Sequence, residues 1–152
     1  MKYIDLTHTF TSQMPIFPGD SLPALIKVKE IEKNGSADHQ ITTGMHVGTH
    51  MDAPAHMLVG GKYLHEYAPE KFFGRGVVID ARGKDLADVD LLSNAKIQQG
   101  DIVLVYFGFG EKFLEKEYYS KYPEITKVFA EECVKLGVSI LGMDTPSPDR
   151  AP

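Results

Sequence analysis

Three histidines and one aspartate fall within eleven residues of this 152-residue chain, in the stretch His46-Val-Gly-Thr-His50-Met-Asp52-Ala-Pro-Ala-His56. Two imidazoles and one carboxylate form a common ligand set for Zn²⁺, Mn²⁺ or Fe²⁺. Three protein ligands leave one position open for water, which a catalytic site needs and a structural site lacks. Water on such an ion has its pKa lowered from about 15.7 to about 7, so hydroxide forms at neutral pH. We therefore predict a catalytic metal site made by His46, His50 and Asp52.

The spacing of these residues predicts that they share one face of a strand. Alternate side chains of an extended chain point the same way, and His46, His50 and Asp52 all occupy even positions. Gly48 lies between the two histidines and is expected to leave a hole for an ion. A helix would also bring the histidines together, but the glycine and proline of this segment disfavour one. Val47 moreover stands where the zincin motif HExxH requires glutamate.

His56 is the candidate for proton transfer. It follows Asp52 by four residues, after the turn that Pro54 imposes, so it is near the site without being a ligand. An unperturbed imidazole titrates near pH ~6.5, so it can take a proton from water and return it to a leaving amine. The alternative is three scattered histidines on a solvated strand, which the shared face disfavours. The remaining histidines are interpreted as surface or core residues: His8, His39 and His65.

The surrounding elements predict a mixed α/β (α+β) fold. The near-continuous apolar run over 102–107 indicates a strand buried on both faces. A helix is expected over 123–136, where apolar residues recur every three or four positions between a proline and a glycine. A second helix is expected over 88–96. The other expected strands cover 3–10, 25–31, 40–50, 76–80 and 138–143, with loops at 14–23 and 145–148.

Composition limits the classes of function. Hydrophobic residues make up 43% and charged residues 24%, which indicates one globular domain. A net charge of −5 without a basic stripe argues against nucleic acid as a partner. No apolar run reaches the ~18 residues of a membrane span and no secretory signal is visible, so we expect no membrane partner and a cytoplasmic location. One cysteine, Cys133, excludes a disulfide within the chain and a cysteine-based zinc site.

Several conspicuous residues are expected to be structural. Cys133 lies on the apolar stripe of the predicted helix and should be inert core. Arg75 and Arg82 are expected on a solvated face. Phenylalanines 107, 109 and 113 are assigned to the core, and aspartates 5, 20 and 80 to turns or strand ends.

The central segment resembles the HxGTHxDxPxH signature of the cyclase family of metal-dependent hydrolases, which includes the bacterial kynurenine formamidases and isatin hydrolases. Three flanking stretches are also similar to the family: Tyr3-Ile-Asp-Leu-Thr-His, Pro18-Gly-Asp and Leu141-Gly-Met-Asp-Thr-Pro-Ser-Pro-Asp. The resemblance implies a swivelling β/β/α domain over residues 1–152 and a homodimer.

The resemblance also implies roles for the clustered residues. His46, His50 and Asp52 would bind one metal, Zn or Mn, and Asp52 would bridge to a second ion. Metal hydroxide would attack the carbonyl of a small-molecule amide or formamide, as in an arylformamidase, and His56 would protonate the nitrogen.

Two departures from the family pattern affect these expectations. The histidine and glutamate that complete the second metal site in the family lie downstream of the last motif, so we expect the domain to be truncated at its C-terminus. The alternatives are an incomplete second site or ligands that come from elsewhere. Phe17 stands where the kynurenine formamidases carry a pocket tryptophan. It can still stack on a substrate ring, but other amides and esters become open as substrates. The alternatives are a non-catalytic metal- or ligand-binding module of the same fold, and an inert fragment.

Overall fold

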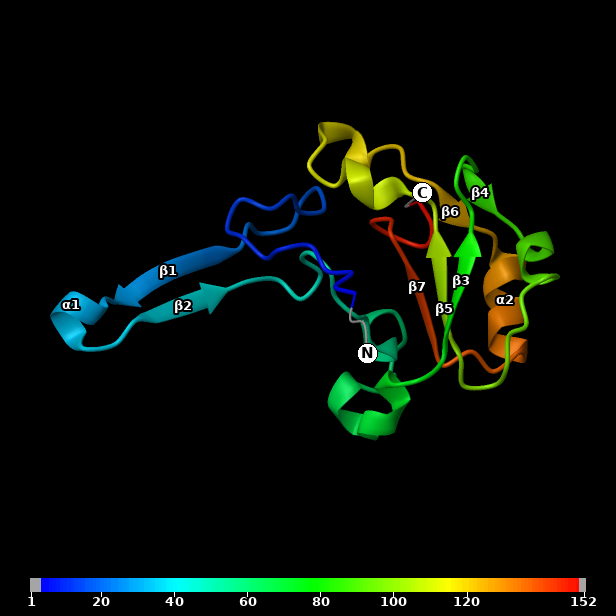
Figure 1. Ribbon diagram of the computed structural model, residues 1–152, viewed down its shortest axis with the longest axis horizontal. Helices are drawn as coiled ribbons and strands as arrows, with labels where there is room; N and C mark the ends of the chain where they lie inside the picture. Colours follow the sequence, from blue (N-terminus) through cyan, green and yellow to red (C-terminus); the bar gives the residue numbers. More distant parts are fainter. Residues whose placement is uncertain (1–3, 151–152) are drawn as a thin grey trace. The chain divides into compact units, whose positions relative to one another are not determined.

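The computed structural model describes residues 4–150, and its order of elements confirms the predicted mixed α/β class (Figure 1). The chain divides into two compact units, one ending at Tyr63 and the other beginning at Leu64. Within residues 4–150, no helix is long and apolar enough to cross a membrane.

The first unit contains an antiparallel ribbon of two strands, β1 (Ala24–Lys29) and β2 (Asp38–Thr42). The short helix α1 (Ile31–Asn34) joins them and ends at Gly35, whose φ of 71° is left-handed. Leu25 lies opposite Ile41, and both are about half exposed. The predicted strand over 25–31 is therefore confirmed in its first part, and the ribbon exposes apolar side chains to solvent.

The remainder of the first unit is mostly irregular. The strand predicted over 3–10 is wrong for residues 4–10, and Tyr3 lies outside the described residues. Asp5 accepts hydrogen bonds from the Thr7 amide (2.9 Å) and hydroxyl (2.6 Å), so a local side-chain contact replaces strand pairing here. The expected extended stretch 40–50 ends as a strand at Thr42. The 3₁₀ turn η1 (Pro54–His56) follows.

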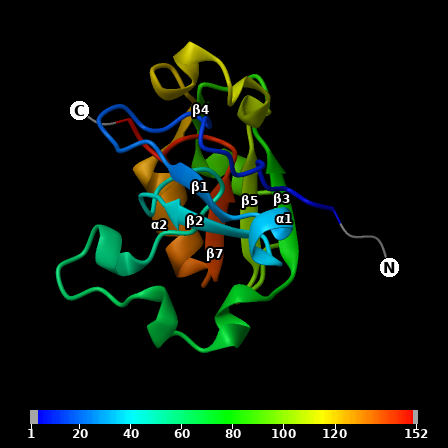
Figure 2. The ribbon, with the colours of Figure 1, turned by 90° about the vertical axis from the view of Figure 1, so that its left-hand side faces the viewer.

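The second unit is built on a parallel sheet in the order β3 (Gly76–Asp80), β5 (Ile102–Tyr106), β7 (Ile140–Met143). These strands run side by side in Figures 1 and 2. A second, two-stranded sheet pairs β4 (Leu86–Ala87) with β6 (Glu124–Ile125). The other elements are helix α2 (Lys127–Lys135) and the 3₁₀ turns η2 (Leu64–Glu66), η3 (Pro69–Phe72), η4 (Val89–Leu92), η5 (Phe109–Lys112) and η6 (Lys116–Tyr119).

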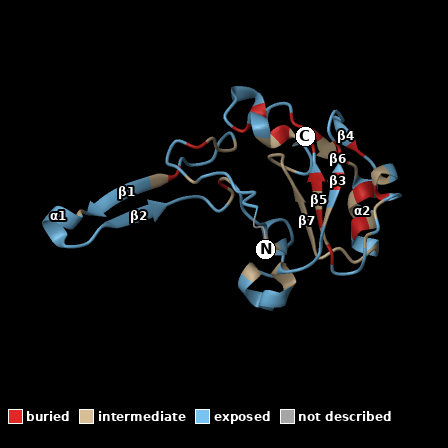
Figure 3. Ribbon diagram, in the orientation of Figure 1, coloured by how far each residue is buried: buried red, intermediate tan, exposed pale blue. Residues whose placement is uncertain are grey.

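The core of this unit is concentrated on β5 and α2 (Figure 3). Val103, Val105 and Phe129 are almost completely buried. Burial along β5 nevertheless alternates, because Leu104 is half-buried and Tyr106 is exposed. The prediction that this strand is buried on both faces is therefore wrong. The phenylalanines expected in the core, 107, 109 and 113, are buried, as is Cys133.

Both predicted helices are shorter in the structure. The α2 helix begins only after Thr126, whose hydroxyl accepts from the Phe129 amide (3.0 Å), because the preceding residues form β6. In place of the helix over 88–96, Asp88 caps the η4 turn through the Val89 amide (2.7 Å). The Asp88 carboxylate also accepts from the Thr126 hydroxyl (2.8 Å), which joins the starts of the two helical segments.

Arg75 is exposed, as expected, with about 49% of its side chain open to solvent, but it has a buried partner. Its guanidinium donates to both carboxylate oxygens of the buried Asp101, at 3.0 and 2.5 Å. The guanidinium lowers the pKa of the Asp101 carboxyl, and the Gln98 amide adds to the effect. Arg82, by contrast, forms an exposed pair with Asp80, the last residue of β3.

Candidate metal centre

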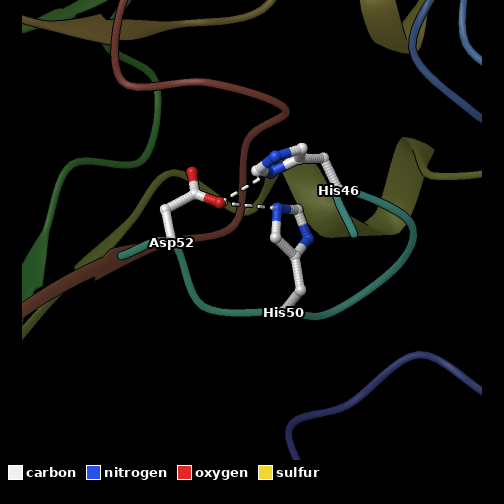
Figure 4. A group of neighbouring side chains, drawn as sticks. All are labelled: His46, His50 and Asp52. Carbon is white, nitrogen blue, oxygen red and sulfur yellow. Dashed lines mark ion pairs between the residues drawn. The ribbon is translucent and has the colours of Figure 1, made fainter. Parts of the chain in front are cut away.

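The structure brings His46, His50 and Asp52 together, as the sequence predicts (Figure 4). One nitrogen or oxygen from each residue lies within 4.8 Å of the others. Asp52 Oδ1 is 2.7 Å from His46 Nδ1 and 3.4 Å from His50 Nε2. All three side chains are partly open to solvent. The group thus combines three metal-ligating atoms with access from outside.

These candidate ligands lie on a loop and not on a strand, so the predicted element is wrong although the three side chains come together as predicted. Gly48 has a φ of 69°, which breaks the extended backbone between the two histidines. Its carbonyl oxygen accepts a hydrogen bond from His50 Nδ1 at 2.7 Å. Gly48 therefore bends the loop and orients a candidate ligand. The space beside it, which was predicted to hold an ion, is filled by the Met14 side chain.

The hydrogen bond to Gly48 fixes which nitrogen of His50 faces the site. A carbonyl oxygen only accepts, so the proton in the neutral imidazole is on Nδ1 and Nε2 carries a lone pair. That lone pair faces Asp52 Oδ1, which also only accepts when ionised. Two acceptors 3.4 Å apart favour a cation between them.

The donor set fits a divalent metal. Zinc binds imidazole nitrogen and carboxylate oxygen at about 2.0–2.2 Å, so ligands at a tetrahedral ion lie roughly 3.3 Å apart. The distance between His50 Nε2 and Asp52 Oδ1 already matches this value, whereas His46 Nδ1 and Asp52 Oδ1, at 2.7 Å, are within hydrogen-bond distance. A small opening of that one contact would accommodate an ion. The same ligands also suit manganese, so the donors do not select between the two metals.

His56 lies beside the group, as predicted. It ends the η1 turn, which begins at Pro54, and its ring centroid is 3.9 Å from that of His46 with the planes tilted by 36°. Gly61 supports this turn from behind, because a Cβ there would lie 2.6 Å from the Pro54 carbonyl carbon. The His56 ring is therefore held against a ligand by a closely packed backbone.

Three features that position the site were not anticipated from the sequence. Met14, far from the motif in sequence, is buried against Gly48. The Thr49 hydroxyl accepts from the His8 amide at 3.0 Å, which ties the N-terminal segment to the loop. The third is the close packing at Gly61; its place in a Gly60-Gly61 pair after the motif was the only available signal.

Phe17, the candidate substrate-binding residue, is half-buried in a turn where its carbonyl accepts from the Asp20 amide at 3.1 Å. Its role toward a substrate stays a prediction.

The fold and the site together define the class of this protein. It is a mixed α/β protein with a His-His-Asp group on a loop of its first unit. A family model described as "Putative cyclase" matches residues 4–150. The chain therefore belongs to the cyclase family, as its motifs indicated.

Particular relatives agree with this assignment. A kynurenine formamidase of Erythrobacter litoralis is 28% identical over 146 residues, covering 95% of this chain and 66% of that protein. An uncharacterised protein of Methanocaldococcus jannaschii is 31% identical over 144 residues, covering 95% of this chain and 68% of that protein. The structure of isatin hydrolase A from Ralstonia solanacearum superposes with a TM-score of 0.83 at 23% identity, over 97% of this chain and 68% of that one. This chain thus spans about two thirds of the length of its relatives and shares the isatin hydrolase fold.

Proposed function

We propose that this protein is a metal-dependent hydrolase that cleaves an amide C–N bond of a small molecule. The observation that carries the proposal is the convergence of three ligand atoms within 4.8 Å beside the ring of a fourth residue, His56. Relatives named kynurenine formamidase, and the fold shared with an isatin hydrolase, support an amide as the substrate class.

In this proposal His46, His50 and Asp52 hold a divalent cation, Zn²⁺ or Mn²⁺. When bound, such a cation polarises a carbonyl group and lowers the pKa of water. The Gly48 carbonyl keeps the His50 Nε2 lone pair directed at the site, and Asp52 supplies the negative charge that balances a divalent ion. Partial exposure of all three ligands leaves access for a small substrate.

His56 is proposed as the general acid and base. An imidazole nitrogen takes a proton from the attacking water and then donates it to the nitrogen of the breaking C–N bond. That transfer makes the amine a neutral leaving group, and His56 returns to its starting state. Its contact with the His46 ring holds it at the edge of the metal group without using it as a ligand.

The substrate is proposed to be an arylformamide or a related cyclic aryl amide. Phe17 is proposed to stack on its ring, since aromatic pairs prefer offset or edge-to-face contacts with the apolar part of a ligand.

Two variants separate the proposed roles. His50→Ala should lose bound metal and turnover together, because it removes a ligand. His56→Ala should keep the metal while turnover falls by about 10²–10⁴-fold. His39→Ala, on the exposed β2 strand, is the matched control and should change neither. Metal content is measured by plasma mass spectrometry, and turnover on a panel of aryl formamides and cyclic aryl amides. Full activity of His56→Ala would contradict its role, and metal binding without turnover of any substrate would instead indicate a non-catalytic binding module.

We also propose that the chain forms a homodimer, supported by the apolar side chains that the β1–β2 ribbon exposes. A two-stranded ribbon is at best marginally stable alone in water, and Leu25 and Ile41 form an exposed apolar pair on one of its faces. Ile41→Lys should therefore weaken the dimer, and Ile41→Leu, which keeps an apolar side chain at the same place, should not. Sedimentation equilibrium measures the association, and a wild-type chain that is monomeric would refute the proposal.

A further inference from the structure

The first unit has a very small core, and two of its buried residues, Met14 and Val47, lie at the loop that carries the proposed metal ligands. Among its described residues only Met14, Pro23 and Val47 are buried. Val47 stands between His46 and Gly48 in the ligand loop. Met14 comes from a different segment, where its amide donates to the Thr11 carbonyl (3.3 Å) in a turn. Met14 therefore brings a buried side chain to the loop from a segment outside the motif.

The end of the Met14 side chain contacts Gly48. A Cβ added to Gly48 would lie 2.5 Å from Met14 Cε and 3.5 Å from its Sδ, so the thioether fills the space beside the glycine Cα. Only 2% of Met14 is exposed, which leaves its methyl group little room to move away. The contact therefore limits where the Gly48 peptide can lie.

The position of that peptide matters because its carbonyl sets the orientation of a ligand. Gly48 O accepts from His50 Nδ1 at 2.7 Å, and this leaves His50 Nε2 facing Asp52 Oδ1. Partners that hold the second nitrogen of a ligating histidine typically change metal affinity about 10–100-fold when they are removed. In this chain the partner is the backbone carbonyl of Gly48, which no side-chain substitution can remove. Its geometry depends on what packs against the glycine.

We propose that Met14 is a positioning residue of the metal centre, acting through Gly48 on the orientation of His50; this inference rests on the metal site of the proposed function. The unbranched thioether reaches the Cα of a glycine in a left-handed conformation, where the side chain of alanine or valine would end too early. Met14 also precedes Phe17 by three residues, so the segment that supports the metal loop is the one proposed to contact the substrate.

The first test compares metal affinity among variants of the full chain. Zn²⁺ affinity is measured by competition with a chromophoric chelator, and ligand geometry by the visible absorption of bound Co²⁺. Met14→Ala should bind Zn²⁺ about 10–100-fold more weakly and change the Co²⁺ spectrum. Met14→Leu roughly conserves the side-chain volume, and its Zn²⁺ affinity should fall by less than about tenfold. Met45→Ala is the matched control, because it makes the same substitution next to a ligand at a residue that is 80% exposed, and it should match the wild type.

A second control separates positioning from stability. Pro23 belongs to the same small core, but none of its atoms lies within 4 Å of where a Gly48 Cβ would be. Pro23→Ala should therefore leave the Co²⁺ spectrum unchanged even where the melting temperature falls. Equal changes of the Co²⁺ spectrum in Pro23→Ala and Met14→Ala would overturn the positioning role, because Met14 would then act only through the stability of the core.

A double-mutant cycle with Gly48→Ala tests the proposed route. Backbone strain from an alanine at φ of 69° should by itself lower the Zn²⁺ affinity about 5–30-fold. In the wild type its Cβ must also displace Met14, so the loss of Zn²⁺ affinity should exceed that range. In the Met14→Ala background the loss should fall within it, because the space is then free. Should Met14→Ala prevent the first unit from folding, Met14→Val serves in the same cycle, since its side chain is too short to reach Gly48.

Weaker Zn²⁺ binding by Met14→Ala, rescue by leucine and non-additivity with Gly48→Ala support the inference. Unchanged affinity in Met14→Ala, or strict additivity of the two losses, overturns it while the proposed function stands. A wild-type chain that binds no Zn²⁺ or Co²⁺ overturns both.

Discussion

Saturation with Zn²⁺ should slow amide hydrogen exchange in the first unit and leave the second unit unchanged. All three proposed ligands lie in the first unit, which has three buried side chains among its described residues. Residues 64–150 carry their own core around Val103 and Phe129. Openings that separate the ligands should therefore be suppressed by metal, whereas openings confined to the second unit should not.

The size of the effect follows from mass action. A ligand that binds only the closed form stabilises it by RT ln(1 + [L]/Kd), about 2.7 kcal/mol at 100 times the Kd. Exchange through site-breaking openings should thus slow by about 100-fold at that free Zn²⁺ concentration. The amides of His8, bonded to the Thr49 hydroxyl (3.0 Å), and His56, bonded to the Ala53 carbonyl (2.9 Å), report on these openings.

The assay is hydrogen exchange followed by mass spectrometry, with and without Zn²⁺, on the wild type and on His50→Ala. The Ala81 amide, which donates to the Tyr106 carbonyl (2.8 Å), serves as the reference in the second unit. We expect protection only in peptides from residues 4–63 of the wild type, and none in His50→Ala. Equal slowing in both units, or slowing of the second unit alone, would refute the placement of the metal.

Three further predictions concern the two units separately. Phe129→Ala should lower the free energy of unfolding by about 3–5 kcal/mol in urea titrations, because the ring is fully buried, and exposed Val128→Ala should change it by less than about 0.5 kcal/mol. The Arg75 guanidinium lowers the pKa of the Asp101 carboxyl in the folded protein. The ionised carboxylate therefore stabilises the fold fully above pH ~4, and this contribution is lost as pH falls through the lowered pKa. Asp101→Asn should therefore lower the urea midpoint at neutral pH and converge on the wild type in acid; a constant difference across pH would argue against the ion pair. Gly61→Ala should displace the turn that carries His56 and reduce turnover, measured with metal content as the control, and unchanged turnover would show that the turn tolerates a Cβ.

The grouping of the candidate metal ligands was predictable from the sequence because residue type alone restricts their chemistry. Imidazole and carboxylate groups at short spacing meet in many backbone conformations, so the group was found although the strand was wrong. A period of two in polar residues describes a strand, but a loop bent at one glycine satisfies it as well. The φ of 69° at Gly48, which decides between them, leaves no signal beyond the glycine itself.

Long-range contacts account for what the sequence did not reveal. The pairing of exposed Arg75 with buried Asp101 was not predicted, because the two residues are 26 positions apart and the burial of Asp101 depends on the completed second unit. Met14 contacts Gly48 across a similar gap in sequence. The helix predicted over 123–136 lost its first turn because strand pairing of β6 with β4, a tertiary contact, prevailed over local helix signals.

The most direct test of the central claim is the metal content of the purified chain, measured by plasma mass spectrometry after purification without chelator or affinity nickel. The account predicts at least one Zn²⁺ or Mn²⁺ per chain, retained in His56→Ala and lost in His50→Ala. A chain that holds no metal even after addition of Zn²⁺ or Mn²⁺ would contradict it, because His46, His50 and Asp52 would then not form a metal site.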